Sequence, residues 1–254
     1  GRILFDLNDD RLDLRVSTYP TLYGEKSVLR LLNISDAMHD LDGLGFEKDI
    51  LNQFDDMLIG GEGIILVSGP TGSGKTTTLY STLNKMDKPD VNIVTIEDPI
   101  EFDLDNINQA QVNRRSGVTF ASALRAILRQ DPDIIMVGEV RDEETVELAI
   151  RAALTGHLVF STIHTNDSAA GFTRLLNWGM EPFLITSTVK GILAQRLVRK
   201  LCKECREKHM VEPSELTRFG LEVDEAMQFY RAVGCLSCRN TGYQGRVGLF
   251  ELIR

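Results

Sequence analysis

The sequence predicts an α/β protein built on a mostly parallel sheet, and three observations support this class. From residue 60 onward, short apolar runs such as GIILVS alternate with segments of helical period. This first run leads directly into the glycine-rich stretch SGPTGSGKTTT, after which a helix is predicted from about Lys75. Near the end of the chain, two C-x-x-C pairs stand apart from the alternation. Together these patterns predict an α/β core followed by a small separate lobe.

The individual elements are predicted in order along the chain. Residues 11–32 alternate in the strand manner around a Pro-Thr-Leu-Tyr-Gly stretch, which predicts a hairpin. After residue 165 the pattern turns helical, and Pro182 is expected in the first turn of a helix that runs to about Lys200. The expected core strands are GIILVS, VNIVTI, DIIMVG and HLVFSTI, and the expected helices start near Lys75 or cover residues 119–130 and 142–154.

These elements divide the chain into predicted segments. The chain begins at Gly1, without a methionine and inside strand-rich sequence, so we expect it to be an excerpt of a longer protein. The expected segments are a fragment of a preceding strand-rich domain (1–35), a linker and entry to the core (36–60), the α/β core (61–200), a small cysteine-bearing lobe (201–245) and the start of a further segment (246–254).

The composition is that of an ordinary globular protein, with 254 residues of which 43% are hydrophobic and 26% charged. No apolar run reaches the length of a membrane-spanning helix and no signal peptide is visible, which predicts a cytoplasmic protein. The net charge of -9 argues against a nucleic-acid partner, because phosphate backbones are held by clustered Lys and Arg. One basic cluster is interpreted as a solvated helix end, in preference to a contact with acidic lipid or a partner. It comprises Arg196, Arg199, Lys200, Lys203, Arg206 and Lys208.

The glycine-rich stretch fits the phosphate-loop pattern G-x-x-x-x-G-K-[ST]. Glycines let backbone amides turn toward phosphate oxygens, Lys75 supplies a positive charge, and the Thr76 hydroxyl is suited to ligate Mg²⁺. The flanking strand and helix favour this interpretation over a glycine-rich turn that fits by chance. The predicted nucleotide-binding residues are Gly69, Pro70, Thr71, Gly72, Ser73, Gly74, Lys75, Thr76 and Thr77.

A second strand end lacks the aspartate that many phosphate-loop enzymes present to a magnesium-bound water. In DIIMVGE, Gly138 occupies the comparable position and the acid is Glu139. Ligands of open α/β sheets bind at the carboxyl ends of the strands. We therefore predict that Glu139 orders the metal's water shell or the attacking water. The alternative is a solvent-facing glutamate that pairs with Arg141.

A third strand end carries three carboxylates, in the stretch TIEDPIEF. Glu97, Asp98 and Glu101 follow the apolar run, and Pro99 keeps them out of a helix. Such carboxylates repel one another unless a cation or an arginine is near, which favours a metal or phosphate site. An ordinary acidic turn explains the stretch equally well.

The histidines and arginines offer further candidates. His157 and His164 bracket the strand LVFSTI, so they are not expected to touch each other. His164 is placed to sense a phosphate, although a backbone-bonded core histidine is the simpler interpretation of either residue. Arginines stabilise charge on a transferring phosphoryl group, and surface ion pairing explains each of them equally well. The candidates by placement are Arg15, Arg30, Arg125 and Arg129.

The paired C-x-x-C motifs use every cysteine of the chain and predict a closed, structural Zn²⁺ site. Disulfides are the alternative, which the absence of a signal peptide disfavours. The four predicted ligands are Cys202, Cys205, Cys235 and Cys238.

These motifs together resemble the secretion traffic ATPases, the family of bacterial type II secretion and type IV pilus assembly ATPases. The resemblance covers nearly the whole chain and rests on GPTGSGKTTTLY, TIEDPIEF, LRAILRQDPDIIMVGEVRD, TGHLVFSTIHTND, AQRLVRKLC and the paired C-x-x-C. It implies a RecA-like core, ATP and Mg²⁺ as cofactors, and a homo-hexameric ring. It also implies an inner-membrane platform protein and a membrane-anchored docking protein as partners, at the cytoplasmic face of the inner membrane. The tetracysteine lobe is typical of extension motors and counts against the pilus-retraction branch.

The resemblance also implies roles for individual residues. Glu101 matches the general base that activates water, and Glu139 matches the acid near magnesium. The family's histidine box corresponds to the stretch that holds His157 and His164. Among the arginines, Arg15 and Arg30 match residues that reach the phosphates from the preceding domain. The helix before DIIMVG supplies the other two, Arg125 and Arg129, which match arginines at the subunit interface.

The expected activity is ATP hydrolysis that drives pseudopilus or pilus extension and protein export. A RecA-like nucleic-acid translocase would share the phosphate loop, but it should carry basic, aromatic-bearing strands. A nucleotide kinase would release a phosphorylated product in place of inorganic phosphate. A non-catalytic zinc-bearing scaffold would show no hydrolysis that depends on Lys75.

Overall fold

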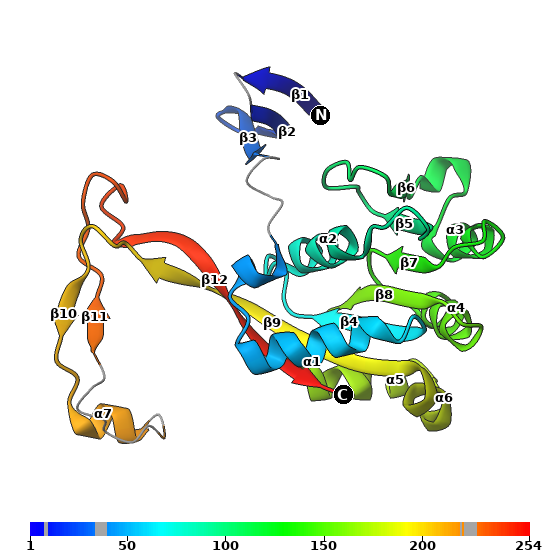
Figure 1. Ribbon diagram of the computed structural model, residues 1–254. Helices are drawn as coiled ribbons and strands as arrows, with labels where there is room; N and C mark the ends of the chain where they lie inside the picture. The colour runs from blue at the N-terminus through cyan, green and yellow to red at the C-terminus, as the bar shows by residue number, and fades with distance from the viewer. Residues whose placement is uncertain (8–9, 34–39, 219, 221–227) are drawn as a thin grey trace. The chain divides into compact units, whose positions relative to one another are not determined.

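The computed structural model describes residues 1–7, 10–33, 40–218, 220 and 228–254 (Figure 1). The predicted boundary between residues 35 and 36 lies outside these residues. Three antiparallel strands form the first sheet, in the order β1-β2-β3. They are β1 (Arg2–Leu7), β2 (Asp10–Thr21) and β3 (Gly24–Asn33). The hairpin predicted within 11–32 is β2–β3, in which Thr21 pairs with Gly24. Gly24 has a φ of +113°, which its lack of a Cβ permits in so tight a turn.

The core is a seven-stranded sheet with the order β12-β9-β4-β8-β7-β5-β6. The strand pairs from β9 to β6 are all parallel, which confirms the predicted α/β class with a mostly parallel sheet. All four predicted core strands are present. The strands are β4 (Gly63–Ser68), β5 (Ile93–Glu97), β6 (Asn108–Gln111), β7 (Ile134–Val137), β8 (Leu158–Ile163), β9 (Val189–Leu201) and β12 (Tyr243–Ile253).

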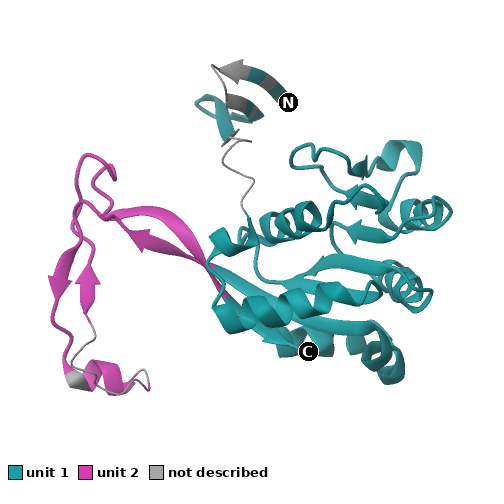
Figure 2. Cartoon of the chain, in the orientation of Figure 1, with its two compact units in different colours: residues 1–196, 250–254 teal, residues 197–249 magenta. Residues whose placement is uncertain are grey.

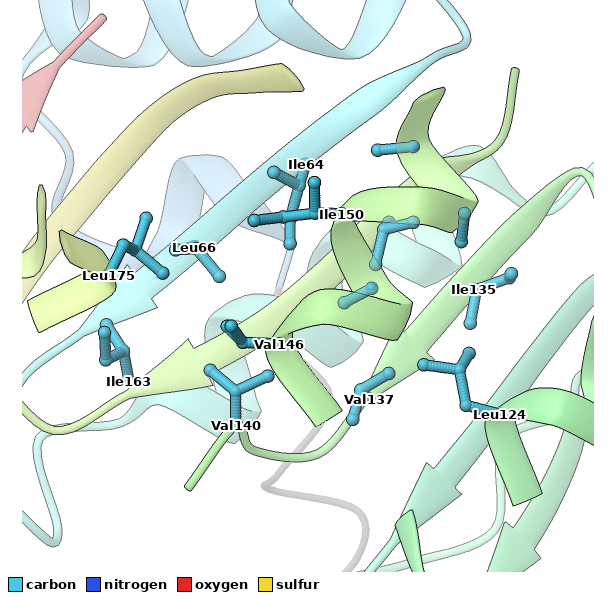
Figure 3. Close-up of a cluster of buried hydrophobic side chains, with 14 of the residues drawn as sticks. Ile64, Leu66, Leu124, Ile135, Val137, Val140, Val146, Ile150, Ile163 and Leu175 are labelled. Carbon is cyan, nitrogen blue, oxygen red and sulfur yellow. The ribbon is translucent and has the colours of Figure 1, made fainter. Parts of the chain in front are cut away.

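Helices cover the sheet on both faces, as the apolar strands require. Each residue of β4 is buried, and alternate side chains enter opposite clusters. Ile64 and Leu66 pack with α3, α4, α5 and α6, whereas Ile65 and Val67 pack with α1 and α2. Figure 3 shows the first cluster. The core helices are α1 (Lys48–Ile59), α2 (Lys75–Met86), α3 (Phe120–Ile127), α4 (Glu143–Leu154), α5 (Ser168–Asn177) and α6 (Pro182–Thr188), with 3-10 turns at Leu41–Leu44 and Arg114–Ser116.

The prediction of a helix from Pro182 to about Lys200 is wrong. The helix ends at Thr188, and the next residues form strand β9. An apolar run of this kind fits a buried strand and a buried helix alike. Gly191 permits the close packing of this strand, because a Cβ there would lie 2.7 Å from the Met57 sulfur and 2.9 Å from the Ile253 carbonyl oxygen. Strand β9 therefore packs closely against α1 and β12 at this residue.

The chain divides into two compact units, coloured separately in Figure 2. One comprises residues 1–196 with 250–254, and the other comprises residues 197–249. The chain enters the second unit within β9 and leaves it within β12. This unit contains β10 (Glu207–His209) paired with β11 (Phe229–Arg231), and the short helix α7 (Pro213–Arg218). None of the described helices is both long enough and apolar enough to cross a bilayer.

The predicted solvated helix end at the basic cluster is also wrong, because these residues lie on strand β9 and in the second unit. The guanidinium of Arg199 lies 3.9 Å from the centre of the Tyr243 ring. Arg206 lies 4.5 Å from the centre of the Tyr230 ring. These two cations therefore stack on aromatic faces within the lobe.

Candidate functional site

The phosphate loop joins β4 to α2 and depends on its glycines. Gly69, Gly72 and Gly74 have φ values of +147°, +78° and +89°, a region that side chains with a Cβ rarely enter. At Gly69 a Cβ would also lie 2.5 Å from the Gln195 carbonyl oxygen and from Ser73 Oγ. The motif glycines are therefore required by both backbone conformation and space.

The helix that follows presents an open amino-terminal end to this loop. Gly74 is the N-cap residue of α2 and has no side chain to accept from the first backbone N–H groups. Lys75 and the half-buried Thr76 occupy the first turn. Unsatisfied N–H groups and the positive end of the helix dipole together favour an anion. The loop thus has the local structure that a phosphate site needs.

Lys75 is buried and held by the loop itself. Its Nζ donates to the carbonyl oxygens of Gly69 at 2.8 Å and Pro70 at 3.1 Å. Burial lowers the pKa of Lys75, while the nearby charge of Glu139 opposes that shift. No carboxylate of the described residues lies within ion-pairing distance of Nζ. A buried cation without a direct counter-charge favours the binding of an anionic ligand.

Gln195 supports the loop from the neighbouring strand β9, and the sequence did not single it out. Its Nε2 donates to the Ser73 carbonyl oxygen at 2.7 Å. Its Oε1 accepts from the Thr78 hydroxyl at 2.8 Å. All three residues are buried. The signal available in the sequence was a glutamine within an otherwise apolar run.

The glycine at the end of β7 packs closely against the neighbouring strand. Gly138 approaches strand β5 so closely that a Cβ would lie 3.3 Å from Glu97 Cα and from the Ile96 carbonyl oxygen. The Gly138 N–H donates to Ile96 at 2.8 Å, and its carbonyl accepts from the Thr162 hydroxyl at 2.7 Å. A side chain at Gly138 would therefore be crowded, and the acid of this strand end is Glu139, one residue later.

Glu139 is buried beside the phosphate loop and has two charged or titratable neighbours. Its Oε2 lies 2.5 Å from Arg141 Nε and 3.6 Å from His164 Nε2. The predicted alternative of a pair with Arg141 is therefore present, but the carboxylate does not face solvent, since its side chain is only 10% exposed. Burial foremost, and then the charge of Lys75, lower the pKa of His164. Lys75, Glu139 and His164 thus share one environment.

The three acids of the TIEDPIEF stretch have separate partners. Glu97 is 3% exposed and accepts from Tyr80, Thr95 and Gln109. Asp98 Oδ2 lies 3.6 Å from Arg114 Nη2, and Glu101 Oε2 lies 2.6 Å from Arg15 Nη2. The predicted group of three carboxylates around one ligand is therefore wrong for Glu97, which is enclosed by protein donors. Asp98 and Glu101 remain partly exposed.

Arg15 connects the first sheet to Glu101. Besides the ion pair, its Nη2 donates to the Glu101 carbonyl oxygen at 3.5 Å. Arg30 is the direct cross-strand partner of Arg15 in the β2–β3 ladder. The structure therefore places one predicted arginine at the predicted base and the other beside it on an exposed stretch of β3.

The other predicted residues have separate surroundings. Arg125 pairs with Glu144 at 2.6 Å, between α3 and α4. Arg129 follows α3 and is exposed. His157 Nδ1 lies 2.9 Å from the Ala152 carbonyl oxygen, which fits the simpler interpretation of a histidine bonded to backbone. None of the described contacts joins these three residues to the phosphate loop.

The four cysteines meet in the second unit as unbridged thiols. All four sulfurs lie within 4.8 Å of one another, and the pairs Cys202–Cys235 and Cys205–Cys238 are separated by 3.9 and 3.8 Å. Four thiolates around a Zn²⁺ at about 2.3 Å would be about 3.8 Å apart, so the donor set fits this ion. The Cys238 sulfur also accepts from the backbone N–H groups of Cys235 and Gly242, each at 3.2 Å. Such donors stabilise metal-bound thiolates.

Comparison with known proteins identifies the family. The model of the family described as type II/IV secretion system protein matches residues 1–254. The chain is 49% identical over 253 residues to the type II secretion system protein E of Aeromonas hydrophila. This match covers 100% of this chain and 50% of the relative. It is 50% identical over 257 residues to the type IV pilus assembly ATPase PilB of Pseudomonas aeruginosa, covering 100% of this chain and 45% of the relative. The chain thus spans about half the length of the curated relatives it matches.

A solved structure supports the same assignment. The crystal structure of the pilus retraction motor PilT with bound ADP matches with a TM-score of 0.63 at 35% identity. The match covers 80% of this chain and 60% of that one. Because the family model covers the chain from end to end, the chain belongs to the type II/IV secretion system protein family.

Proposed function

We propose that this chain is the catalytic part of an ATP-hydrolysing motor for protein export or pilus assembly. The observation that carries the proposal is the buried Lys75, which lies in a phosphate loop without a direct counter-charge and shares its surroundings with Glu139. Family membership supports it, and relatives of nearly equal identity carry secretion and pilus names.

The proposed roles follow from the contacts of each residue. Lys75 and the loop amides hold the phosphates of ATP, and the Thr76 hydroxyl with Glu139 holds Mg²⁺ and its water. Bound Mg²⁺ would neutralise charge that develops on the transferring phosphoryl group. Glu101 acts as the general base for the attacking water, and His164 senses the phosphate beside Glu139. The donor set of Thr76 and Glu139 is oxygen-only, which suits Mg²⁺.

Four arginines are proposed to link ATP hydrolysis to movements of the first sheet and of neighbouring subunits. Arg15 and Arg30 couple closure of the first sheet on the core to the bound nucleotide. The ion pair of Arg15 with Glu101 supports this role. Arg125 and Arg129 lie on or after α3 and act between subunits of a homo-hexameric ring. In the ring, the ion pair of Arg125 with Glu144 would be exchanged for a contact with the neighbouring nucleotide.

The partners are proposed from the family and from the lobe. A cytoplasmic motor of this kind would act on an inner-membrane platform protein and be held there by a membrane-anchored docking protein. The four cysteines would hold a structural Zn²⁺ in the second unit, and their spacing supports this proposal. The lobe favours an extension motor over a retraction motor.

Two substitutions test the proposed activity in the protein at its natural length. Lys75→Ala is expected to abolish both ATP binding and hydrolysis. Glu101→Gln is expected to keep ATP binding and remove turnover, because the amide retains the shape but not the basicity of the carboxylate. Unchanged turnover in Lys75→Ala would overturn the proposal, and unchanged turnover in Glu101→Gln would overturn the role of the base.

The same assay separates the other candidate functions. Thin-layer chromatography of labelled ATP should show inorganic phosphate, whereas a kinase would yield a phosphorylated acceptor. Addition of DNA or RNA should leave the rate unchanged. Nucleic-acid-stimulated hydrolysis would favour the translocase instead, which the net charge of -9 disfavours.

A further inference from the structure

Tyr80 is a buried tyrosine of α2 whose hydroxyl reaches the end of strand β5. It lies five residues after Lys75 on the same helix and is 2% exposed. Its hydroxyl donates to Oε2 of Glu97. The Tyr80 hydroxyl oxygen in turn accepts from the Glu101 backbone N–H at 3.3 Å and from Gln109 Nε2 at 3.4 Å. One hydroxyl therefore connects the phosphate-loop helix to the stretch that carries the proposed base.

Glu97 fixes the direction of this hydroxyl. Its carboxylate also accepts from the Thr95 hydroxyl at 2.6 Å and from Gln109 Nε2 at 3.1 Å. A tyrosine has one O–H donor, so a donor committed to Glu97 leaves the phenolic oxygen free to accept. The phenolic oxygen of Tyr80 therefore accepts from the Glu101 N–H. Glu97 is enclosed by these donors and acts as the anchor of the network.

Gln109, on strand β6, holds the following residues of the same loop. Its Oε1 accepts from the Leu104 N–H at 2.7 Å, and its Nε2 donates to the Phe102 carbonyl oxygen at 3.3 Å. The Phe102 ring packs edge-on against Tyr80, with ring centres 4.7 Å apart. The loop is thus held at Glu101, Phe102 and Leu104 by side chains from α2 and β6.

We propose that Tyr80, with Gln109, is a positioning residue that sets the place of Glu101 relative to the phosphate loop. Lys75 and Tyr80 belong to one rigid helix, so the contact with the Glu101 backbone fixes the spacing between the phosphate-binding lysine and the proposed base. This inference rests on the proposed role of Glu101. Tyr80 does not touch the reacting atoms in this proposal and acts only through the loop.

Tyr80→Phe removes the contacts of the hydroxyl with Glu97 and the Glu101 N–H and retains the ring that packs on Phe102. We expect kcat to fall by about 10-fold, below the roughly 100-fold cost of misplacing a catalytic group by ~1 Å. The Kd for ATP should not change, because the phosphate loop keeps its own contacts. Gln109→Leu should likewise lower kcat and leave the Kd for ATP unchanged. The matched control is Tyr230→Phe, which removes an exposed hydroxyl in the lobe and should leave both constants unchanged.

The outcomes separate this inference from the proposed function. A wild-type kcat in Tyr80→Phe, or a weaker Kd with an unchanged kcat, would overturn the positioning role. If Tyr80→Phe fails to fold in a thermal melt, the same two criteria apply to Gln109→Leu. Full turnover in Glu101→Gln would instead show that Glu101 is not the base, whatever the Tyr80 variant does.

Discussion

The Nε atom of Arg141 lies 2.5 Å from Oε2 of Glu139, although the two side chains differ greatly in exposure. The glutamate side chain is 10% exposed and the arginine side chain 58%. The arginine therefore covers a buried carboxylate from the solvent side, while His164 approaches the same oxygen at 3.6 Å. This arrangement leads to three predictions, for turnover, for the titration of the histidine and for the pH dependence of stability.

Glu139→Gln should reduce ATP turnover by about 100-fold, as expected when one charged group directed at the reaction centre is lost. ATP binding should persist, because Lys75 and the loop amides are unchanged. Steady-state hydrolysis and equilibrium binding of ATP measure the two effects. Glu147→Gln is the matched control, since Glu147 is a partly exposed glutamate that pairs with Arg151 on α4. Equal turnover in the two variants would contradict the role of Glu139.

His164 should titrate below the ordinary histidine value of 6.5, because burial and Lys75 disfavour its charged form. Arg141 also lowers the pKa of His164 and Glu139 raises it, so Arg141→Ala should move this pKa up and Glu139→Gln should move it down. NMR titration of the labelled imidazole measures the shifts. Arg151→Ala is the control and should leave the titration unchanged. A pKa of His164 above 6.5 would refute the assignment of causes.

The same lowered pKa predicts how stability depends on pH. The unfolded chain binds the His164 proton more readily than the folded one, so this residue destabilises the fold as pH falls below the unfolded pKa. This destabilising contribution is absent above the unfolded pKa, grows as pH falls between the two pKa values, and is complete below the folded pKa. Unfolding measured across this window should lose part of its pH dependence in His164→Gln. An identical pH dependence in that variant would contradict the prediction.

The sequence predicted the parts of this site that depend on local pattern. The strand GIILVS, the phosphate loop and the helix from Lys75 follow one another within a few residues, and the structure places them as predicted. Strand β9 was not predicted, because the run after Val189 fits both a buried strand and a buried helix, and its pairing with β4 joins residues distant in the sequence. Local pattern is thus sufficient where the chemistry is contiguous in the chain.

Contacts between distant residues account for what the sequence could not predict. Gln195 and Ser73 are 122 residues apart, and the contact depends on β9 lying beside β4. Tyr80 and Glu97 are 17 residues apart, on α2 and β5, and their hydrogen bond depends on how these two elements are placed in the fold. Polar side chains within buried apolar runs indicated that such contacts exist. Their partners depend on the order of the strands in the sheet, which the hydrophobic pattern of the sequence does not determine.

Removal of the proposed Zn²⁺ should unfold the lobe and leave the core intact, because the two units are compact separately. Cys238→Ser should lose bound zinc, measured by atomic absorption, and hydrogen exchange should become fast between residues 197 and 249. Ser237→Ala lies between the same two cysteines, is exposed, and should retain the metal. A protein purified without chelators that contains no zinc, or a Cys238→Ser lobe that stays protected, would refute the structural site.

Gln195→Leu tests whether strand β9 stabilises the phosphate loop. The change leaves the Ser73 carbonyl and the Thr78 hydroxyl buried without their partners, at a cost of about 1–3 kcal/mol each. We expect a lower melting temperature and weaker ATP binding, since the loop loses its support. Thr78→Val in the same background should recover part of this loss, because it removes one of the two orphaned groups. Gln53→Leu, on an exposed position of α1, should change stability by less than about 0.5 kcal/mol. Strictly additive effects of the Gln195 and Thr78 substitutions would show that the two side chains are not coupled.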